Sequence, residues 1–106
     1  MMITQEQLDN IVSRIIHAYS PEQIILFGSY ARGTANEGSD LDLFLVKDTE
    51  LSPEDRSIVI RKALRDIILP MDILVYTPAE VEKDQRRKFT FVHEIFKTGK
   101  VLYARS

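Results

Sequence analysis

The sequence predicts an α/β (α+β) fold, in which a small mixed β-sheet is packed with helices. Short apolar runs typical of strands alternate along the chain with longer segments whose apolar residues recur at helical spacing. Several of the longer segments open with residues typical of helix starts. The 106 residues are 44% hydrophobic, which is normal for one globular domain spanning 1–106 and argues against a disordered chain.

The N-terminal segment predicts a helix followed by the first strand. Thr4 and Gln7 have the spacing of a capping box. Downstream, apolar residues recur one or three positions apart and form one stripe for packing on a sheet: Leu8, Ile11, Val12, Ile15, Ile16 and Tyr19. Ser20-Pro21-Glu22 breaks this helix, and residues 23–27 predict a buried strand.

A second helix is expected to begin at Ser52. Ser52 and Pro53 supply a cap and a first-position proline, and acids follow in the first turn. Apolar residues continue at helical spacing as far as Ile68, and Pro70 ends the helix. Residues 71–76 predict the next strand. The basic residues of this helix are expected to form a solvated face: Arg56, Arg61, Lys62 and Arg65.

A third helix is expected to begin at Thr77-Pro78, a capped start. The polar run 84–88 continues it until Gly99, a plausible helix stop. Its last apolar residues are expected in the core or on a partner-facing patch rather than in a base-stacking platform: Phe89, Phe91, Val92, Ile95 and Phe96. Residues 101–103 are expected to add a short terminal strand.

Two aspartates mark the start of the apolar run that ends at Val46. Side chains alternate along a strand, so Asp40 and Asp42 are expected to share one face, with Cα atoms about 6.5 Å apart. Carboxylates this close repel each other unless a proton or a cation intervenes. Because Mg²⁺ prefers oxygen ligands and often combines carboxylates with substrate phosphates, the pair predicts a magnesium site.

A Gly-Ser turn follows the first predicted strand. Gly28 lets the backbone turn sharply and lets a ligand approach closely. Ser29 offers a hydroxyl and an N–H group, and residues 30–32 can begin a short helix whose N–H groups bind phosphate oxygens. Arg32 has two open interpretations, since it either reaches the triphosphate or pairs with a carboxylate to fix the loop. The stretch therefore predicts a nucleoside triphosphate held between this turn and a carboxylate-bound metal.

Composition excludes several other classes of protein. A net charge of −2 gives no general attraction for nucleic acid. The sequence contains no cysteine, which excludes disulfides, thiolate zinc sites and a thiol nucleophile. No apolar run approaches the roughly 20 residues of a membrane span, and no basic-then-apolar leader opens the chain. We therefore expect a cytoplasmic protein with no membrane partner.

The spacing of these residues resembles the signature of the DNA polymerase beta-like nucleotidyltransferase superfamily. The matching positions are Gly28-Ser29, then ten residues, then Asp40-x-Asp42, with Ala31-Arg32-Gly33 and Ser39 in between. The similarity is closest to the minimal nucleotidyltransferase (MNT) branch, small prokaryotic domains often paired with HEPN-domain ribonuclease toxins. Because the motif is long and fixed in spacing, we treat it as a specific signal and expect the nucleotidyltransferase fold.

The resemblance implies metal-dependent transfer of AMP from ATP. It assigns Asp40, Asp42 and a third carboxylate, Asp72, to catalysis and to one or two Mg²⁺ ions. Asp72 would complete the second metal position or accept the proton of the attacking hydroxyl; the alternative is a strand-edge aspartate bonded to a local amide. The functional interpretation is favoured because a carboxylate within an apolar run is costly to bury unpaired. The resemblance assigns nucleotide binding to four residues: Gly28, Ser29, Arg32 and Ser39.

The resemblance also implies an acceptor. In MNT pairs the AMP is attached to a tyrosine of the HEPN toxin, which would make this chain the antitoxin. The chain ends soon after its predicted core, so we expect the partner to supply the acceptor hydroxyl. Two alternatives remain open: an antitoxin that silences its partner by binding alone, and nucleotidyl transfer to the hydroxyl of a small molecule such as an aminoglycoside.

Overall fold

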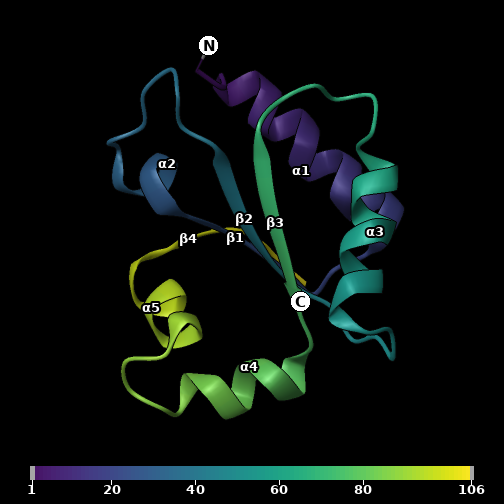
Figure 1. Ribbon diagram of the computed structural model, residues 1–106, viewed down its shortest axis with the longest axis vertical. Coiled ribbons are helices and arrows are strands. Elements are labelled where there is room, and N and C mark those ends of the chain that lie inside the picture. Colours follow the sequence, from purple (N-terminus) through teal and green to yellow (C-terminus); the bar gives the residue numbers. More distant parts are fainter. Residues whose placement is uncertain (1, 106) are drawn as a thin grey trace.

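A four-stranded mixed β-sheet with helices on both faces forms the protein in a computed structural model that describes residues 2–105 (Figure 1). The strands lie in the order β3-β2-β1-β4. The central strand β1 (Gln23–Phe27) pairs antiparallel with β2 (Leu41–Val46) and with β4 (Lys100–Ala104), whereas β2 pairs parallel with β3 (Met71–Tyr76). The predicted α/β class with a small mixed sheet is confirmed.

Two hydrophobic clusters lie on opposite faces of the sheet. Helices α1 (Gln5–Tyr19) and α3 (Pro53–Ala63) cover one face, and α4 (Pro78–Gln85) and α5 (Phe91–Thr98) cover the other (Figure 1). Alternate residues of β2 belong to the two clusters, with Leu43 on the α1 side and Phe44 on the α5 side. Burial on both faces explains why β2 reads as a nearly continuous apolar run.

The helix starts follow the predicted capping chemistry. The Thr4 hydroxyl accepts the Gln7 N–H at 3.1 Å, and the Gln7 side chain accepts the Thr4 N–H at 2.9 Å. Ser52 caps α3, and Thr77 forms a second capping box at the start of α4. Gly99 ends α5, as expected, with its N–H on the Ile95 carbonyl. In the described part of the chain, every helix is too short or too polar to cross a membrane.

Helix α3 ends at Ala63, so the prediction that it continues to Ile68 is wrong. The Ala63 carbonyl accepts a hydrogen bond of 3.1 Å from Arg14 of α1, whose guanidinium also binds Asp66 at 2.6 and 3.1 Å. A side chain from a distant helix thus occupies the last turn of α3. Ile68, expected on the apolar stripe, is 94% exposed.

The third predicted helix is two helices, α4 and α5, joined by residues 86–90. Phe89 has φ of 70°, a left-handed conformation that does not continue a helix. Thr90 starts α5, since its hydroxyl accepts the His93 N–H at 3.1 Å and donates to the Asp84 carbonyl at 2.7 Å. The prediction of one helix is wrong because the cap at Thr90 was overlooked. The predicted terminal strand is confirmed as β4.

Arg56 is buried, so its predicted place on a solvated face is wrong. It is 6% exposed, and its guanidinium donates to the carbonyls of Leu51 at 2.8 Å and Val75 at 3.3 Å. It also forms an ion pair with Glu80 at 2.8 Å. Arg56 therefore ties α3 to β3 and to the start of α4. The other three basic residues of this segment are exposed, as expected.

Candidate active site

The turn from β1 into α2 (Gly28–Arg32) requires glycine for two reasons. Gly28 has φ of +74°, which side-chain-bearing residues rarely adopt. A Cβ atom at Gly28 would also lie 2.1 Å from Oδ2 and 3.0 Å from Cγ of Asp42. The carboxylate of Asp42 therefore occupies the space that the missing side chain of Gly28 leaves open. This contact brings together two of the predicted site residues.

Strand register brings a second carboxylate beside the first. Asp42 of β2 is aligned with Phe27 of β1 on one side and with Asp72 of β3 on the other. Aligned residues of neighbouring strands point to the same face of a sheet. Phe27, Asp42 and Asp72 therefore form one row across three strands, on the face covered by α4 and α5. We call this the carboxylate row.

The electrostatics of Asp42 show that the predicted carboxyl groups influence one another. Burial raises the pKa of Asp42, and the charges of Asp72 and Asp40 raise it further, while the Arg32 guanidinium opposes them. Asp42 is half-buried, whereas Asp40 and Asp72 are exposed. Asp40 lies one residue before the first residue of β2. Three like charges thus meet at one end of the sheet, where a cation would relieve their repulsion.

The exposure of Asp72 removes one of the two reasons for which it was predicted as a site residue. The family resemblance implies a third carboxylate at this position, and the apolar run around Asp72 predicted a buried carboxylate that needs a partner. Instead, Asp72 is the second residue of an edge strand and is exposed to solvent. Its alignment with Asp42, not burial, connects it with the site.

Ser29 and Arg32 lie at opposite ends of the five-residue helix α2. Ser29 is half-buried, and its carbonyl accepts the Thr34 N–H at 3.0 Å, which closes the turn at Gly33. Arg32 is exposed and forms no ion pair within the described residues 2–105. The loop-fixing interpretation of Arg32 therefore receives no support, and its guanidinium acts on Asp42 only through its charge.

Ser39 orders the loop between α2 and β2. Its hydroxyl accepts the Asn36 N–H at 2.9 Å, and the Asn36 side chain accepts the Gly38 N–H at 2.8 Å. These bonds fold residues 36–39 into a turn directly before Asp40. Nucleotide binding by Ser39 stays a prediction, while its observed contacts give it a role in placing the start of β2.

The three predicted carboxylates are chemically suited to bind a hard divalent cation. Asp40, Asp42 and Asp72 offer carboxylate oxygens, the ligands that Mg²⁺ prefers. Within residues 2–105, no three histidine, aspartate or glutamate side chains are already gathered around one point as a metal site requires.

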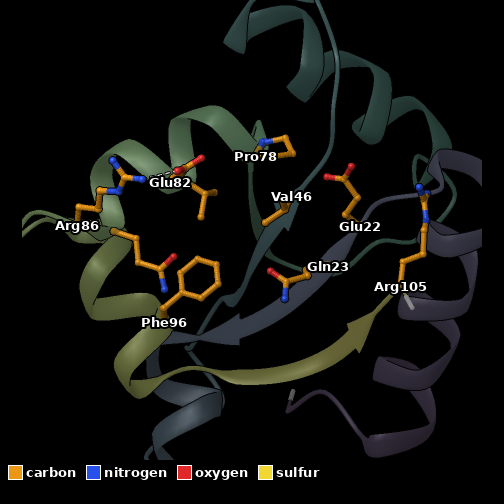
Figure 2. Close-up of a pocket in the computed structure, with 10 residues that line it drawn as sticks. Glu22, Gln23, Val46, Pro78, Glu82, Arg86, Phe96 and Arg105 are labelled. Atoms are coloured by element: carbon orange, nitrogen blue, oxygen red, sulfur yellow. Dashed lines mark hydrogen bonds and ion pairs between the residues drawn. The ribbon is translucent and has the colours of Figure 1, made fainter.

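A cavity of about 610 Å³ lies elsewhere on the same face of the sheet (Figure 2). Val46, Val81 and Phe96 give it apolar walls, and Val46 stands four residues beyond Asp42, about 13 Å along β2. Among its charged lining residues, Arg86 pairs with Glu82 at 2.5 Å and Arg105 donates to the Ser20 carbonyl, whereas the buried Oε2 of Glu22 has no hydrogen-bond partner among residues 2–105. The cavity is thus separate from the carboxylate row and does not include it.

The mixed sheet and the glycine turn that abuts its carboxylate row define a domain of the nucleotidyltransferase class. The chain belongs to the polymerase beta nucleotidyltransferase family, because the family model described as "Polymerase beta, Nucleotidyltransferase" matches residues 9–106. The predicted superfamily is therefore confirmed.

Curated relatives come from the archaeon Methanocaldococcus jannaschii. "Putative protein adenylyltransferase MJ0604" is 32% identical over 84 residues, which cover 77% of this chain and 78% of the relative. "Putative protein adenylyltransferase MJ1305" is 39% identical over 71 residues, which cover 61% of this chain and 46% of the relative. The chain thus spans most of the first protein but less than half the length of the second.

Solved structures share the fold over nearly the whole chain. A "putative nucleotidyltransferase from Sulfolobus solfataricus" aligns with a TM-score of 0.64 and 25% identity, covering 92% of this chain and 78% of that one. A structure described as "the toxin-antitoxin with AMP-PNP" aligns with a TM-score of 0.64 and 20% identity, covering 92% of this chain and 73% of that one. At this identity, the second likeness establishes the fold alone.

Proposed function

We propose that this chain transfers AMP from ATP to a tyrosine hydroxyl of a partner HEPN toxin and so acts as its antitoxin. The observation that carries the proposal is the alignment of Asp42 with Asp72 beside Gly28. Family membership supports nucleotidyl transfer, and the names of the two archaeal relatives support a protein acceptor. The likeness to a toxin–antitoxin structure that contains AMP-PNP supports a toxin as partner and an adenine nucleotide as donor.

In this reaction the acceptor oxygen attacks the α-phosphorus of ATP. The new oxygen–phosphorus bond forms as the bond between the α-phosphorus and the oxygen bridging it to the β-phosphorus breaks. Pyrophosphate leaves with that oxygen. Asp40, Asp42 and Asp72 would hold Mg²⁺, which when bound lowers the pKa of the attacking hydroxyl and neutralises charge on the phosphates. Gly28 and Ser29 would bind the outer phosphates through backbone N–H groups and the serine hydroxyl.

The remaining residues have roles that follow from their exposure. The alternative role of Asp72 is to accept the proton of the attacking hydroxyl instead of holding metal, and its exposure on an edge strand lets an acceptor hydroxyl approach it. Arg32 is exposed and unpaired with any described carboxylate, so its five donors are available to phosphate oxygens. Positioning donor and acceptor in line accounts for much of the expected rate.

The test incubates the full chain with α-labelled ATP, Mg²⁺ and the product of the neighbouring gene. We expect label on a tyrosine of that partner, and loss of the label with the double variant Asp40→Asn, Asp42→Asn. Asp48→Asn is the matched control, because Asp48 is exposed beyond the far end of β2 and should leave transfer intact. Absence of label with all four nucleoside triphosphates would contradict the proposal.

A second candidate is silencing of the partner by binding alone. It is favoured by one observation, that the acidic side chains of residues 2–105 are not gathered into a ready metal site. The same double variant separates the two candidates. Neutralisation of the toxin that survives in the double variant at normal expression would favour binding alone, whereas its loss would favour catalysis.

A further inference from the structure

An aromatic pair extends the carboxylate row on the β1 side. Phe27 is the last residue of β1, directly precedes Gly28, and is aligned with Asp42. Directly opposed residues of antiparallel strands have Cα atoms about 5 Å apart. Phe91, the first residue of α5, packs on Phe27 in a T-shaped contact with ring centroids 5.6 Å apart and planes at 85°. The Phe91 ring is thus fixed beside the row that carries Asp42.

The Phe91 ring keeps much of its surface in water. Phe91 is 49% exposed, whereas Val92 and Ile95 on the same helix are 1% and 3% exposed and anchor α5 to the sheet. In a T-shaped pair the second ring covers at most one face of the first, so Phe27 leaves at least one face of Phe91 uncovered. A single exposed aromatic residue is ordinary on a protein surface. Phe91 differs because its support, Phe27, is also a neighbour of both Gly28 and Asp42.

We propose that Phe91 is the stacking platform for the nucleobase of the bound nucleotide. This inference rests on the proposed function, in which Gly28 and Ser29 bind the outer phosphates and Asp42 lies near the α-phosphate. The nucleoside is attached to the α-phosphate, and Phe91 is the exposed ring that packs on Phe27, the β1 residue aligned with Asp42. Bases stack on aromatic rings whatever their identity, so the platform adds affinity for the base without choosing adenine. The sequence analysis predicted a core or partner-facing role for these aromatic residues. The exposure of Phe91 could not be predicted there, because it depends on how α5 packs on the sheet.

The experiment compares a nucleotide analogue with an inorganic chain of three phosphates that lacks the nucleoside. Calorimetry of the full chain with Mg²⁺ measures the affinity for AMP-PNP and for inorganic tripolyphosphate. We expect Phe91→Leu, which keeps apolar packing but removes the ring, to weaken AMP-PNP binding roughly tenfold. Tripolyphosphate affinity should remain that of the wild type, and Phe91→Tyr should bind both ligands normally. Phe89→Ala is the matched control, since this neighbouring phenylalanine is 98% exposed and should affect neither ligand.

Three outcomes would overturn the inference. In the first, Phe91→Leu binds AMP-PNP as the wild type does; in the second, it loses affinity for both ligands equally, which marks a structural role. In the third, the variant fails only to modify or bind the partner while nucleotide affinity is kept, which makes Phe91 a protein contact. Failure of the proposed function is recognised separately, because the wild type would then label no partner whatever Phe91→Leu does to AMP-PNP binding.

Discussion

The carboxylate of Asp42 fills the position that a side chain on Gly28 would occupy, with Oδ2 only 2.1 Å from where a Cβ atom would stand. The glycine therefore does more than permit a turn with φ of +74°. It admits the Asp42 carboxylate to the point where β1 ends and α2 begins. The proposed activity depends on this contact, since it places the carboxylate beside the predicted phosphate-binding turn.

Two glycines allow the strain of the turn to be separated from the contact with Asp42. Gly33 has φ of +75°, but a Cβ atom added there would meet nothing within 4 Å, so Gly33→Ala adds backbone strain alone. We expect Gly28→Ala and Gly33→Ala each to lower the free energy of unfolding by about 1–2 kcal/mol, because the flexible Asp42 side chain can move aside. Only Gly28→Ala should reduce nucleotidyl transfer, by about 100-fold, because the carboxylate is displaced. Denaturant unfolding and label transfer measure the two effects.

Equal loss of activity in the two variants would contradict this account. It would mean that distortion of α2, rather than displacement of the Asp42 carboxylate, sets the activity. Full activity of Gly28→Ala would contradict it more strongly, because the close contact with Asp42 would then have no role.

The raised pKa of Asp42 predicts that its ionised carboxylate, which the proposed activity needs, lowers the stability of the fold. A carboxyl group whose pKa is higher in the folded state than in the unfolded state lowers stability as the pH rises through that interval. Asp42→Asn should therefore raise the melting temperature at pH 7. This gain should vanish below the ordinary pKa of aspartate, about 4. Because Asp42 is partly exposed to solvent, we expect a gain below about 1 kcal/mol.

Thermal unfolding of wild type and Asp42→Asn from pH 3 to pH 8, without divalent cations, measures this difference. Asp48→Asn, the same substitution at an exposed residue beyond the end of β2, serves as the control. An Asp42→Asn protein that is less stable than the wild type at pH 7 would show that the carboxylate is stabilising in the fold. The repulsion described for the row would then be wrong.

Arg56 predicts a large loss of stability from a residue outside the site. Its guanidinium binds two backbone carbonyls and Glu80 while being 6% exposed. Arg56→Ala leaves these acceptors without a partner, and we expect a loss of about 3 kcal/mol in the free energy of unfolding. Arg61→Ala, on the same helix but exposed, should change stability by less than about 0.5 kcal/mol. Similar unfolding midpoints for the two variants would show that the buried network contributes little.

The Glu80 carboxylate gives this network a pH dependence. Burial raises the pKa of Glu80, but hydrogen bonds from Thr77 and Arg56 outweigh that effect and lower it. A carboxyl group with a lowered pKa stabilises the fold at neutral pH, and this contribution is lost as the pH falls through the folded-state value. The stability difference between wild type and Arg56→Ala should therefore shrink in acid.

Helix starts and the site motif could be predicted from the sequence, because the interactions that determine them are local. Capping residues such as Thr4 and Thr77 are recognisable within four residues, and the Gly28-Ser29 turn and Asp40-x-Asp42 lie within one short stretch. The family was therefore predictable from local spacing, and the family match confirms it. The assignment of individual site residues remains a prediction.

Features that depend on distant contacts were missed or predicted for the wrong reason. Arg56 looked like a surface residue because its partners lie as far as 24 positions away, at Glu80. The end of α3 is occupied by Arg14, which is 49 positions from Ala63. The prediction that Asp72 is buried was wrong, and the feature that links it to Asp42 is the register of two strands that α3 separates in the sequence. Sequence spacing alone contains no such register.

The most direct test of the central claim is a crystal structure of the protein with AMP-PNP and Mn²⁺, a Mg²⁺ substitute with an anomalous X-ray signal. The account predicts an anomalous peak bound by Asp42 together with Asp40 or Asp72, next to the phosphates at Gly28 and Ser29. A nucleotide bound elsewhere, such as in the cavity beside Val46 and Phe96, with no peak at the carboxylate row, would contradict it.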